Sequence, residues 1–174
     1  MTELLLHRDH CTRLLDDLIP AAVRSLWLIT ADIKDLHVAR GKRYIPFLGV
    51  LAELVRSGVS IRMVHAKEPG PRFREDFDRF PELVSAGRKF ERILCPRVHM
   101  KVIIIDHRTA YIGSANMTGA GLGAKSPHRR NFEAGILTDE ASLVQPLIEE
   151  VRQLWAGAHC QRCERRDVCP DPIA

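Results

Sequence analysis

The sequence has no long hydrophobic run, and the apolar stretch nearest its start, Leu4-Leu5-Leu6, is interrupted at once by His7 and Arg8. A membrane-spanning helix needs about 20 mostly apolar residues, and a secretory signal needs an apolar stretch of about 7–15 residues. We therefore expect a cytoplasmic protein without a membrane partner. The chain also lacks internal repeats and low-complexity tracts. Its 174 residues are enough for one hydrophobic core that needs no disulfide framework.

Nucleotide-binding fingerprints are missing as well. The glycines at 113, 119, 121 and 123 do not follow the order of a dinucleotide-binding loop or a P-loop, so we assign no nucleotide cofactor. The excess of positive charge is small, with a formal net charge of +4 and a pI near 8.9. Such a balance favours polyanionic partners without identifying one.

Apolar stretches typical of strands alternate with segments of helical periodicity along the chain. Strands are expected at 25–33, 59–65, 88–95, 98–105, 109–112 and 131–138, helices at 9–20, 43–57, 72–86 and 139–156, and a polar loop at 34–42. This alternation predicts an α/β class, a layered α/β sandwich with a central mixed, mostly parallel sheet. Residues 1–157 form the expected domain, and residues 158–174 a short Cys-rich tail.

One segment combines polar residues with a β-branched run: His99-Met-Lys101-Val-Ile-Ile-Ile-Asp106, followed by Gly113-Ser114-Ala-Asn116. The β-branched run predicts a strand over 98–105 that is buried on both faces. With a period of two, His99 and Lys101 share a face of that strand. Asp106 has the opposite parity and lies at the strand's end, so we interpret it as mainly structural.

These residue types suit phosphodiester chemistry. A neutral imidazole nitrogen of His99 can attack phosphorus, while Lys101 and Asn116 stabilise the charge on the non-bridging oxygens. Ser114 adds a hydroxyl contact, and Gly113 lets the backbone come close to the phosphate.

The pattern H-x-K-x4-D-x6-G-S-x-N resembles the signature of the phospholipase D superfamily. The resemblance covers roughly residues 25–155 and implies cleavage through a phosphohistidine intermediate without a catalytic metal. Glu133 resembles the family's downstream acidic position, which implies that it holds the histidine's tautomer. The chain has one motif, like the short members such as small bacterial endonucleases, which pair two chains. A C2 homodimer would bring two His99 residues to one site.

A basic segment lies between the Gly-Ser-x-Asn turn and Glu133. Its cations Lys125, Arg129 and Arg130 are expected to contact the substrate backbone. The leading hypothesis is therefore a homodimeric, metal-independent nuclease that acts on DNA or RNA. Two alternatives are a phospholipid hydrolase and a nucleic-acid-binding or assembly subunit that docks a helicase or defence-system partner.

The tail carries a C-x2-C-x5-C cluster, Cys160, Cys163 and Cys169, outside the region of family resemblance. Thiols of a cytosolic chain at this spacing favour a structural metal site. A closed zinc site needs a fourth ligand. Cys95, Cys11 and His159 are candidates, of which we favour Cys95. The spacing also resembles the [4Fe-4S] pattern of some RecB-like nucleases, so zinc, an iron-sulfur cluster and free thiols all stay open.

Overall fold

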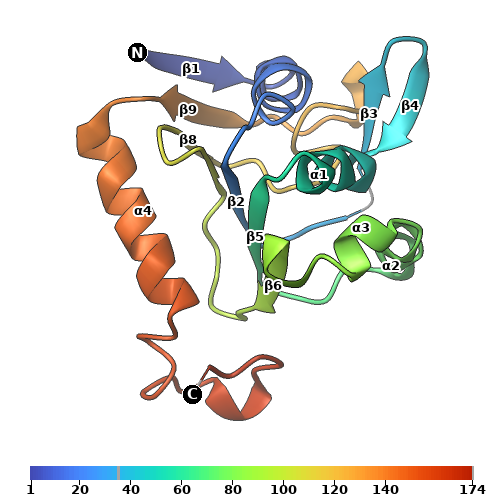
Figure 1. Ribbon diagram of the computed structural model, residues 1–174. Helices are drawn as coiled ribbons and strands as arrows, with labels where there is room; N and C mark the ends of the chain where they lie inside the picture. Colours follow the sequence, from blue (N-terminus) through green and yellow to red (C-terminus); the bar gives the residue numbers. More distant parts are fainter. Residues whose placement is uncertain (35, 174) are drawn as a thin grey trace.

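The computed structural model describes residues 1–34 and 36–173, and within them a seven-stranded sheet forms the centre of the chain (Figure 1). In the order β1-β9-β8-β7-β2-β5-β6, its strands are β1 (Thr2–Leu6), β9 (Ala134–Thr138), β8 (Thr109–Gly113), β7 (Val102–Ile105), β2 (Ser25–Thr30), β5 (Ser60–His65) and β6 (Phe90–Leu94). A separate hairpin pairs β3 (His37–Arg40) with β4 (Arg43–Pro46).

The expected layered α/β sandwich with a mixed sheet is confirmed. β5 pairs in parallel with β2 and with β6. The other four pairings of this sheet are antiparallel: β1 with β9, β9 with β8, β8 with β7, and β7 with β2. The carboxyl ends of β2 and β5 therefore lie at the same edge of the sheet as the start of β7.

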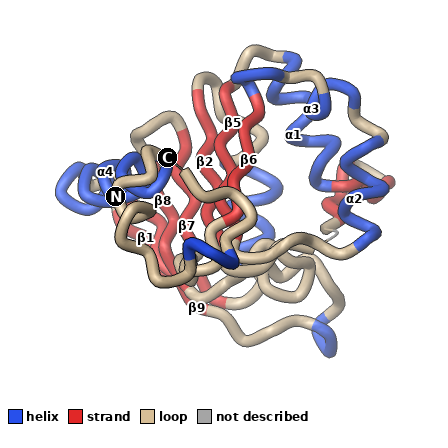
Figure 2. The backbone as a smooth tube through the Cα atoms, turned by 90° about the horizontal axis from the view of Figure 1, so that it is seen from below, coloured by secondary structure: helices blue, strands red, loops and turns tan. Residues whose placement is uncertain are grey.

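Helices cover both faces of the sheet (Figure 2). The π-helix η1 (Cys11–Leu18) and α1 (Phe47–Arg56) pack on one face, and α4 (Ala141–Trp155) packs on the other. The shorter elements are α2 (Pro71–Asp78), α3 (Pro81–Val84), η2 (Gly87–Lys89), η3 (Pro127–Arg129) and η4 (Arg166–Val168). No helix in the described ranges combines the length and apolar composition that crossing a membrane requires.

The β-branched sequence of β7 is explained by the burial of this strand on both faces. Val102 and Ile104 join the core beneath α4, whereas Ile103 and Ile105 join the core beneath α1. A strand that packs on both sides favours β-branched residues without alternation. The strand begins only at Val102, however, so the expected start at residue 98 is wrong, and residues 99–101 belong to the connection from β6.

A proline and a hairpin account for two further differences from the expected elements. The helix expected over 72–86 is two helices, since Phe80 before Pro81 has a non-helical backbone (φ −111°, ψ 89°). The helix expected from residue 43 begins after Pro46, because residues 43–46 pair with 37–40 in a hairpin that replaces the expected loop. β1, at the apolar start of the chain, pairs with β9 and was not expected.

Candidate active site

Polar side chains of the motif meet at one edge of the sheet. Val102, the first residue of β7, pairs with Ile29 near the end of β2 and with Ile112 near the end of β8. Residues before β7, after β8, at or after the end of β2, and before β9 therefore share this edge. They are His99 and Lys101, Ser114 and Asn116, Thr30 and Asp32, and Glu133.

His99 and Lys101 lie side by side on the connection that leads into β7. The Lys101 Nζ atom lies 3.3 Å from His99 Nδ1 and donates a hydrogen bond of 2.7 Å to the His99 carbonyl oxygen. The His99 side chain is exposed, and Lys101 is partly buried. A cation thus stands beside an accessible imidazole, where both can reach one phosphate group.

Asn116 is held with its amide oriented. Its Oδ1 accepts hydrogen bonds from the Asp32 backbone N–H at 3.1 Å and from the Thr30 hydroxyl at 3.3 Å. This arrangement leaves the amide nitrogen as the group that can donate to a phosphate oxygen. Gly121 packs against the backbone of Asn116, since a Cβ there would lie 2.5 Å from the Asn116 carbonyl oxygen.

Ser114 and Glu133 form a hydrogen-bonded pair across β8 and β9. The Ser114 hydroxyl donates to Glu133 Oε2, and it accepts from the Ala134 backbone N–H at 3.1 Å. Asn131 Nδ2 donates to Glu133 Oε1 at 3.0 Å. Among the described residues no hydrogen bond joins Glu133 to His99. The carboxylate thus orients Ser114 in this structure, and its expected role as tautomer holder stays a prediction.

Gly113 is required by packing at the end of β8. A Cβ at this position would lie 2.3 Å from the Tyr111 hydroxyl oxygen and 2.6 Å from the Ala134 carbonyl oxygen. Tyr111 is buried, and burial raises the pKa of its phenol to about 12. The missing side chain therefore makes room for the tyrosine as well as exposing backbone near the site.

Asp106 lies at the opposite end of β7 from His99. Its carboxylate accepts hydrogen bonds from the backbone N–H groups of Val23, Arg24 and Ser25, at 3.1, 2.7 and 2.9 Å. Burial alone would raise the pKa of this carboxyl, but the three hydrogen bonds together hold the pKa below its ordinary value. The carboxylate thereby anchors the segment that enters β2.

Sequence reasoning missed Asp32 and its two lysine partners. Asp32 follows β2, and its carboxylate lies 3.4 Å from Lys34 Nζ and 3.2 Å from Lys67 Nζ. Lys67 follows β5, whose final residue, His65, is a buried core histidine that pairs through Nδ1 with the Lys67 carbonyl oxygen at 2.7 Å. The available signal was the position of these polar residues after two adjacent parallel strands, where ligands commonly bind.

The basic segment lies on the loop that joins Asn116 to Glu133. Lys125 and Arg129 are exposed, and Arg130 is partly buried and donates through Nε to the Lys125 carbonyl oxygen. The segment is anchored at both ends, by hydrogen bonds from Lys125 N to Gly119 O at 3.0 Å and from Asn131 N to Ala120 O at 3.1 Å. Its cations therefore project from an ordered loop next to the motif.

The cysteines proposed as metal ligands line one cavity between the tail and the segment that precedes His99: Cys95, Cys160, Cys163 and Cys169. His159 lines it too, whereas Cys11 lies on η1, where its thiol points to Asp16. In the described part of the chain, no three His, Cys, Asp or Glu side chains already converge as a metal site.

Comparisons with known proteins agree with this geometry. Residues 15–155 match the family described as "Cardiolipin synthase, PLD-like domain". A cardiolipin synthase of Alkalihalophilus pseudofirmus is 31% identical over 128 residues, which make up 71% of this chain and 24% of that protein. Cardiolipin synthase 2 of Bacillus anthracis is 27% identical over 140 residues, 78% of this chain and 24% of that protein. The chain thus spans about a quarter of the length of these relatives.

Solved structures share the fold over nearly the whole chain. The phospholipase D family member Nuc of Salmonella typhimurium has a TM-score of 0.60 at 18% identity, covering 89% of this chain and 93% of that one. NucT of Helicobacter pylori has a TM-score of 0.61 at 13% identity, covering 88% and 94%. With its fold, motif edge and family match together, the chain belongs to the phospholipase D superfamily, in the family of PLD-like domains.

Proposed function

We propose that this chain is a phosphodiesterase that cleaves nucleic acid through a covalent intermediate on His99 and that it works as a homodimer. One observation carries the proposal: an exposed imidazole lies 3.3 Å from the Lys101 ammonium at the edge where Asn116 and Ser114 also lie. A nucleophile, a fixed cation and neutral donors are the groups that phosphoryl transfer without a metal requires.

The residues have separate roles in the proposed reaction. A ring nitrogen of His99 bonds to phosphorus as the bond to the leaving oxygen breaks, and an acid on the opposite side protonates that oxygen. Lys101 and the Asn116 amide stabilise the negative charge on the non-bridging oxygens. Water then attacks phosphorus, the bond to His99 breaks, and the same acid, now a base, accepts the proton of the water.

Nucleic acid is favoured as the substrate by the charge around the site. Lys125 and Arg129 are exposed on the loop between Asn116 and Glu133, and the chain as a whole is basic. Cations on an ordered loop beside the reacting phosphate suit a polymer with phosphates on both sides of the cleaved bond. TrmBL2, an archaeal chromatin protein described with a novel mode of DNA binding, shares the fold with a TM-score of 0.58 at 14% identity, covering 88% of this chain and 51% of that one.

A phospholipid is the second candidate substrate, because the curated relatives are named cardiolipin synthases. Exposed apolar side chains near the site, with Phe132 93% exposed, are compatible with contact to acyl chains. A phosphatidyl group offers the same phosphodiester to His99, so the catalytic residues do not discriminate between the two substrates.

Two observations support the homodimer. His99 and Ser114 are open to solvent, although phosphoryl transfer profits from a site that excludes water. Beside them, Leu4, Ile136 and Ile112 form a row across β1, β9 and β8 in pairing register, with 63%, 41% and 42% of their surfaces exposed. A second chain packed on this row about a two-fold axis would cover the site and supply a second His99 as the acid.

Substrate choice is tested by incubating purified protein with single- and double-stranded DNA, RNA and phospholipid vesicles, each with EDTA. We expect cleavage of nucleic acid that survives EDTA and disappears in His99→Ala and His99→Asn, with folding and binding retained. Release of the phospholipid headgroup without any cleavage of nucleic acid would show that the chain is a phospholipid hydrolase and not a nuclease. A phosphoenzyme trapped on another residue would refute the role of His99.

Dimeric catalysis is tested by mixing wild type with an excess of His99→Ala chains under conditions of subunit exchange. Activity per wild-type chain should fall, because wild-type chains enter inactive heterodimers. Leu4→Ser combined with Ile136→Ser should give the same loss by weakening the dimer, whereas a change at the similarly exposed Val23, outside the row, should not. Constant activity per wild-type chain, unaffected by dilution, would show that one chain is sufficient.

A further inference from the structure

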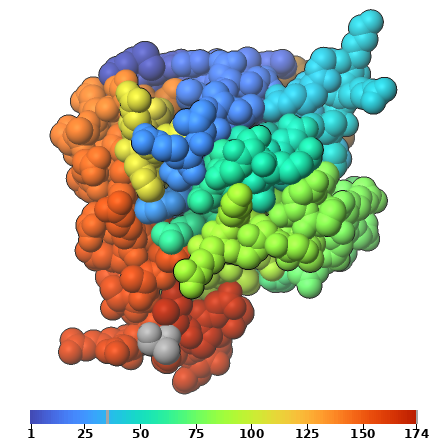
Figure 3. Space-filling view, viewed as in Figure 1, coloured from blue at the N-terminus to red at the C-terminus, as the bar shows by residue number. Residues whose placement is uncertain are grey.

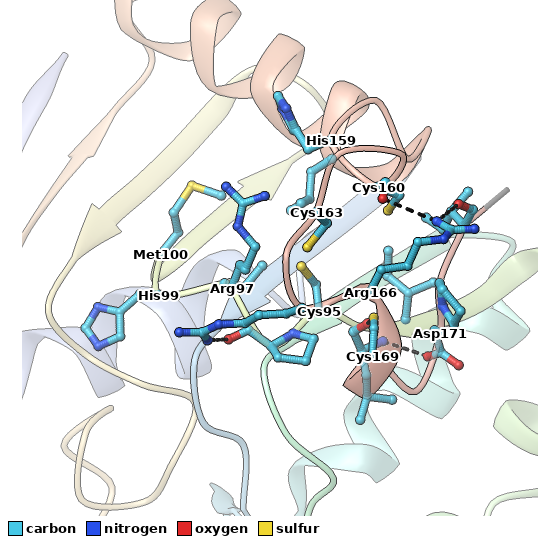
Figure 4. A pocket seen from close by; sticks show the side chains of 18 of the residues that line it. Cys95, Arg97, His99, Met100, His159, Cys160, Cys163, Arg166, Cys169 and Asp171 are labelled. Atoms are coloured by element: carbon cyan, nitrogen blue, oxygen red, sulfur yellow. Dashed lines mark hydrogen bonds between the residues drawn. The ribbon is translucent and has the colours of Figure 1, made fainter.

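A cavity of about 250 Å³ separates the described part of the C-terminal tail, residues 158–173, from the end of β6 and the connection that follows it. Figure 3 shows the tail beneath β6 at one end of the molecule. The cavity is lined by four of the five cysteines of the chain. In Figure 4, Cys95, Cys163 and Cys169 face the space between the tail and residues 93–100, while His99 points away from them.

The tail reaches the cavity through a series of tight turns. Backbone N–H groups donate from Cys160 to Gly157, from Cys163 to Cys160 and from Cys169 to Arg166, at 2.8, 3.2 and 3.2 Å. Because these turns reverse the chain repeatedly, the three cysteines of the tail all line the same cavity although they are separated in the sequence. All of them are free cysteines in this structure.

The tail docks onto residues 94–96, the segment that carries the fourth cysteine. The Leu94 backbone N–H donates to Asp171 Oδ2 at 2.8 Å, and Arg165 donates to the Pro96 carbonyl oxygen at 3.0 Å. The Cys169 thiol donates to the Leu94 carbonyl oxygen at 3.8 Å. These contacts hold the tail against the segment that carries Cys95 without any cross-link.

The tail has little else to keep it folded. No residue from 156 to 173 is buried, and Val168 leaves 73% of its surface exposed. A segment this short cannot build a hydrophobic core, and such segments are stabilised by disulfides or by a structural metal. Four thiols around one cavity are the groups through which a metal would do so.

We propose that Cys95, Cys160, Cys163 and Cys169 bind a structural metal centre, either Zn²⁺ or an iron-sulfur cluster, that fastens the tail to the segment before His99. Four thiolates are complete ligands for either centre. Arginines at the cavity offset the net negative charge of such a centre: Arg97, Arg165 and Arg166.

The size of the cavity bears on the kind of centre. Zinc binds thiolates at about 2.3 Å, which draws four sulfurs to within about 4 Å of one another. The thiols do not converge in this way across the described chain, so zinc requires the tail or the thiol rotamers to close inward. A cubic iron-sulfur cluster holds its four cysteines farther apart, and it fits a wider cavity with less rearrangement.

The test measures zinc, iron and acid-labile sulfide in the full chain, purified with and without oxygen exclusion, together with the visible spectrum. Zinc at about one per chain identifies the ion. Iron and sulfide in equal amounts, at about four each with a broad visible absorbance, identify the cluster. Neither metal under either condition, or a disulfide among the four cysteines in freshly isolated protein, would overturn the proposal.

Substitutions locate the ligands. Metal content should fall several-fold in each of four variants: Cys95→Ser, Cys160→Ser, Cys163→Ser and Cys169→Ser. The control is Cys11→Ser, which alters the remaining cysteine outside the cavity and should leave the metal content unchanged. If the variants do not fold, a mercurial reagent added to wild type should release metal in step with four modified thiols. Full metal content in Cys95→Ser, or metal release that follows Cys11 alone, would contradict the assignment.

Discussion

Asp106 belongs to the signature motif, yet its place in the structure predicts a loss of stability rather than of chemistry when it is changed. Its carboxylate accepts three backbone hydrogen bonds from residues 23–25. Loss of a single hydrogen bond to a charged group costs about 1.5–3 kcal/mol. Asp106→Ala removes three such bonds, so it should lower the free energy of unfolding by at least that amount and Tm by at least about 3–12 °C for a domain of this size.

Asp106→Asn is the matched control. Asp106 has a left-handed backbone, with φ +54°, which asparagine tolerates better than alanine. The amide oxygen can still accept hydrogen bonds, so this variant should lose less than about 1.5 kcal/mol, the usual net contribution of a neutral hydrogen bond.

The pH dependence checks the physical cause. The folded-state pKa of Asp106 lies below its ordinary value of 3.8, so its contribution to stability is fully present above that ordinary pKa. The contribution is lost as pH falls through the folded-state pKa. The stability difference between wild type and Asp106→Asn should therefore be constant near neutral pH and shrink under acid, below about pH 4.

Both properties are measured on the same preparations, by denaturant unfolding from neutral pH to pH 3 and by turnover well below Tm. Turnover should stay within about threefold of wild type, because the four residues of β7 separate Asp106 from the His99 connection by about 10 Å or more. A stably folded Asp106→Asn with turnover reduced a hundredfold would refute this reasoning and give Asp106 a part in the reaction.

Three further predictions concern the motif edge. Lys101→Ala and Asn116→Ala should each lower the single-turnover rate by about 10²-fold to 10³-fold, since each removes a donor to the transition state. Weaker substrate binding with an unchanged single-turnover rate would rule out this role for the two residues. Gly113→Ala should cost about 1–3 kcal/mol of stability through overpacking. Adding Tyr111→Phe should not restore this stability, because the new Cβ would still be too close to the backbone of Ala134 and Gly135. Full recovery of stability in the double variant would show that the Tyr111 hydroxyl is the only group that excludes a side chain at Gly113. The rate should be bell-shaped in pH, because two His99 residues must hold opposite protonation states, whereas a steady rise into the alkaline range would indicate hydroxide as nucleophile.

Local sequence was sufficient to predict the structure of a segment where one kind of interaction dominates it. The β-branched run at 102–105 predicted a strand buried on both faces, and burial on both sides confirms it. The pairing of His99 with Lys101 was expected from strand alternation, but both residues lie before the strand. They meet because Lys101 folds back to the His99 carbonyl oxygen, a loop contact that periodicity does not encode.

Contacts between distant segments explain what sequence patterns did not reveal. Asp32 and Lys67 are 35 positions apart, and they meet only because β2 and β5 are parallel neighbours that end together. The partner of Glu133 depends in the same way on the register of β8 and β9, which sets Ser114 beside Ala134. Register follows from the whole set of strands that pack in the core, so a motif alone does not predict such contacts.

The connection from β6 to β7 links the two proposals physically. It begins at Cys95 beside the tail and reaches Lys101 at the motif edge. Cys95 donates through its backbone to His65 at 2.9 Å, and Val98 donates back to Cys95 at 2.9 Å, so the first half of the connection is already an ordered turn. A metal bound at Cys95 would stiffen this turn from the tail side. The turn ends one residue before His99, so its rigidity bears on how closely the imidazole is held for attack, although the metal would take no part in the reaction itself.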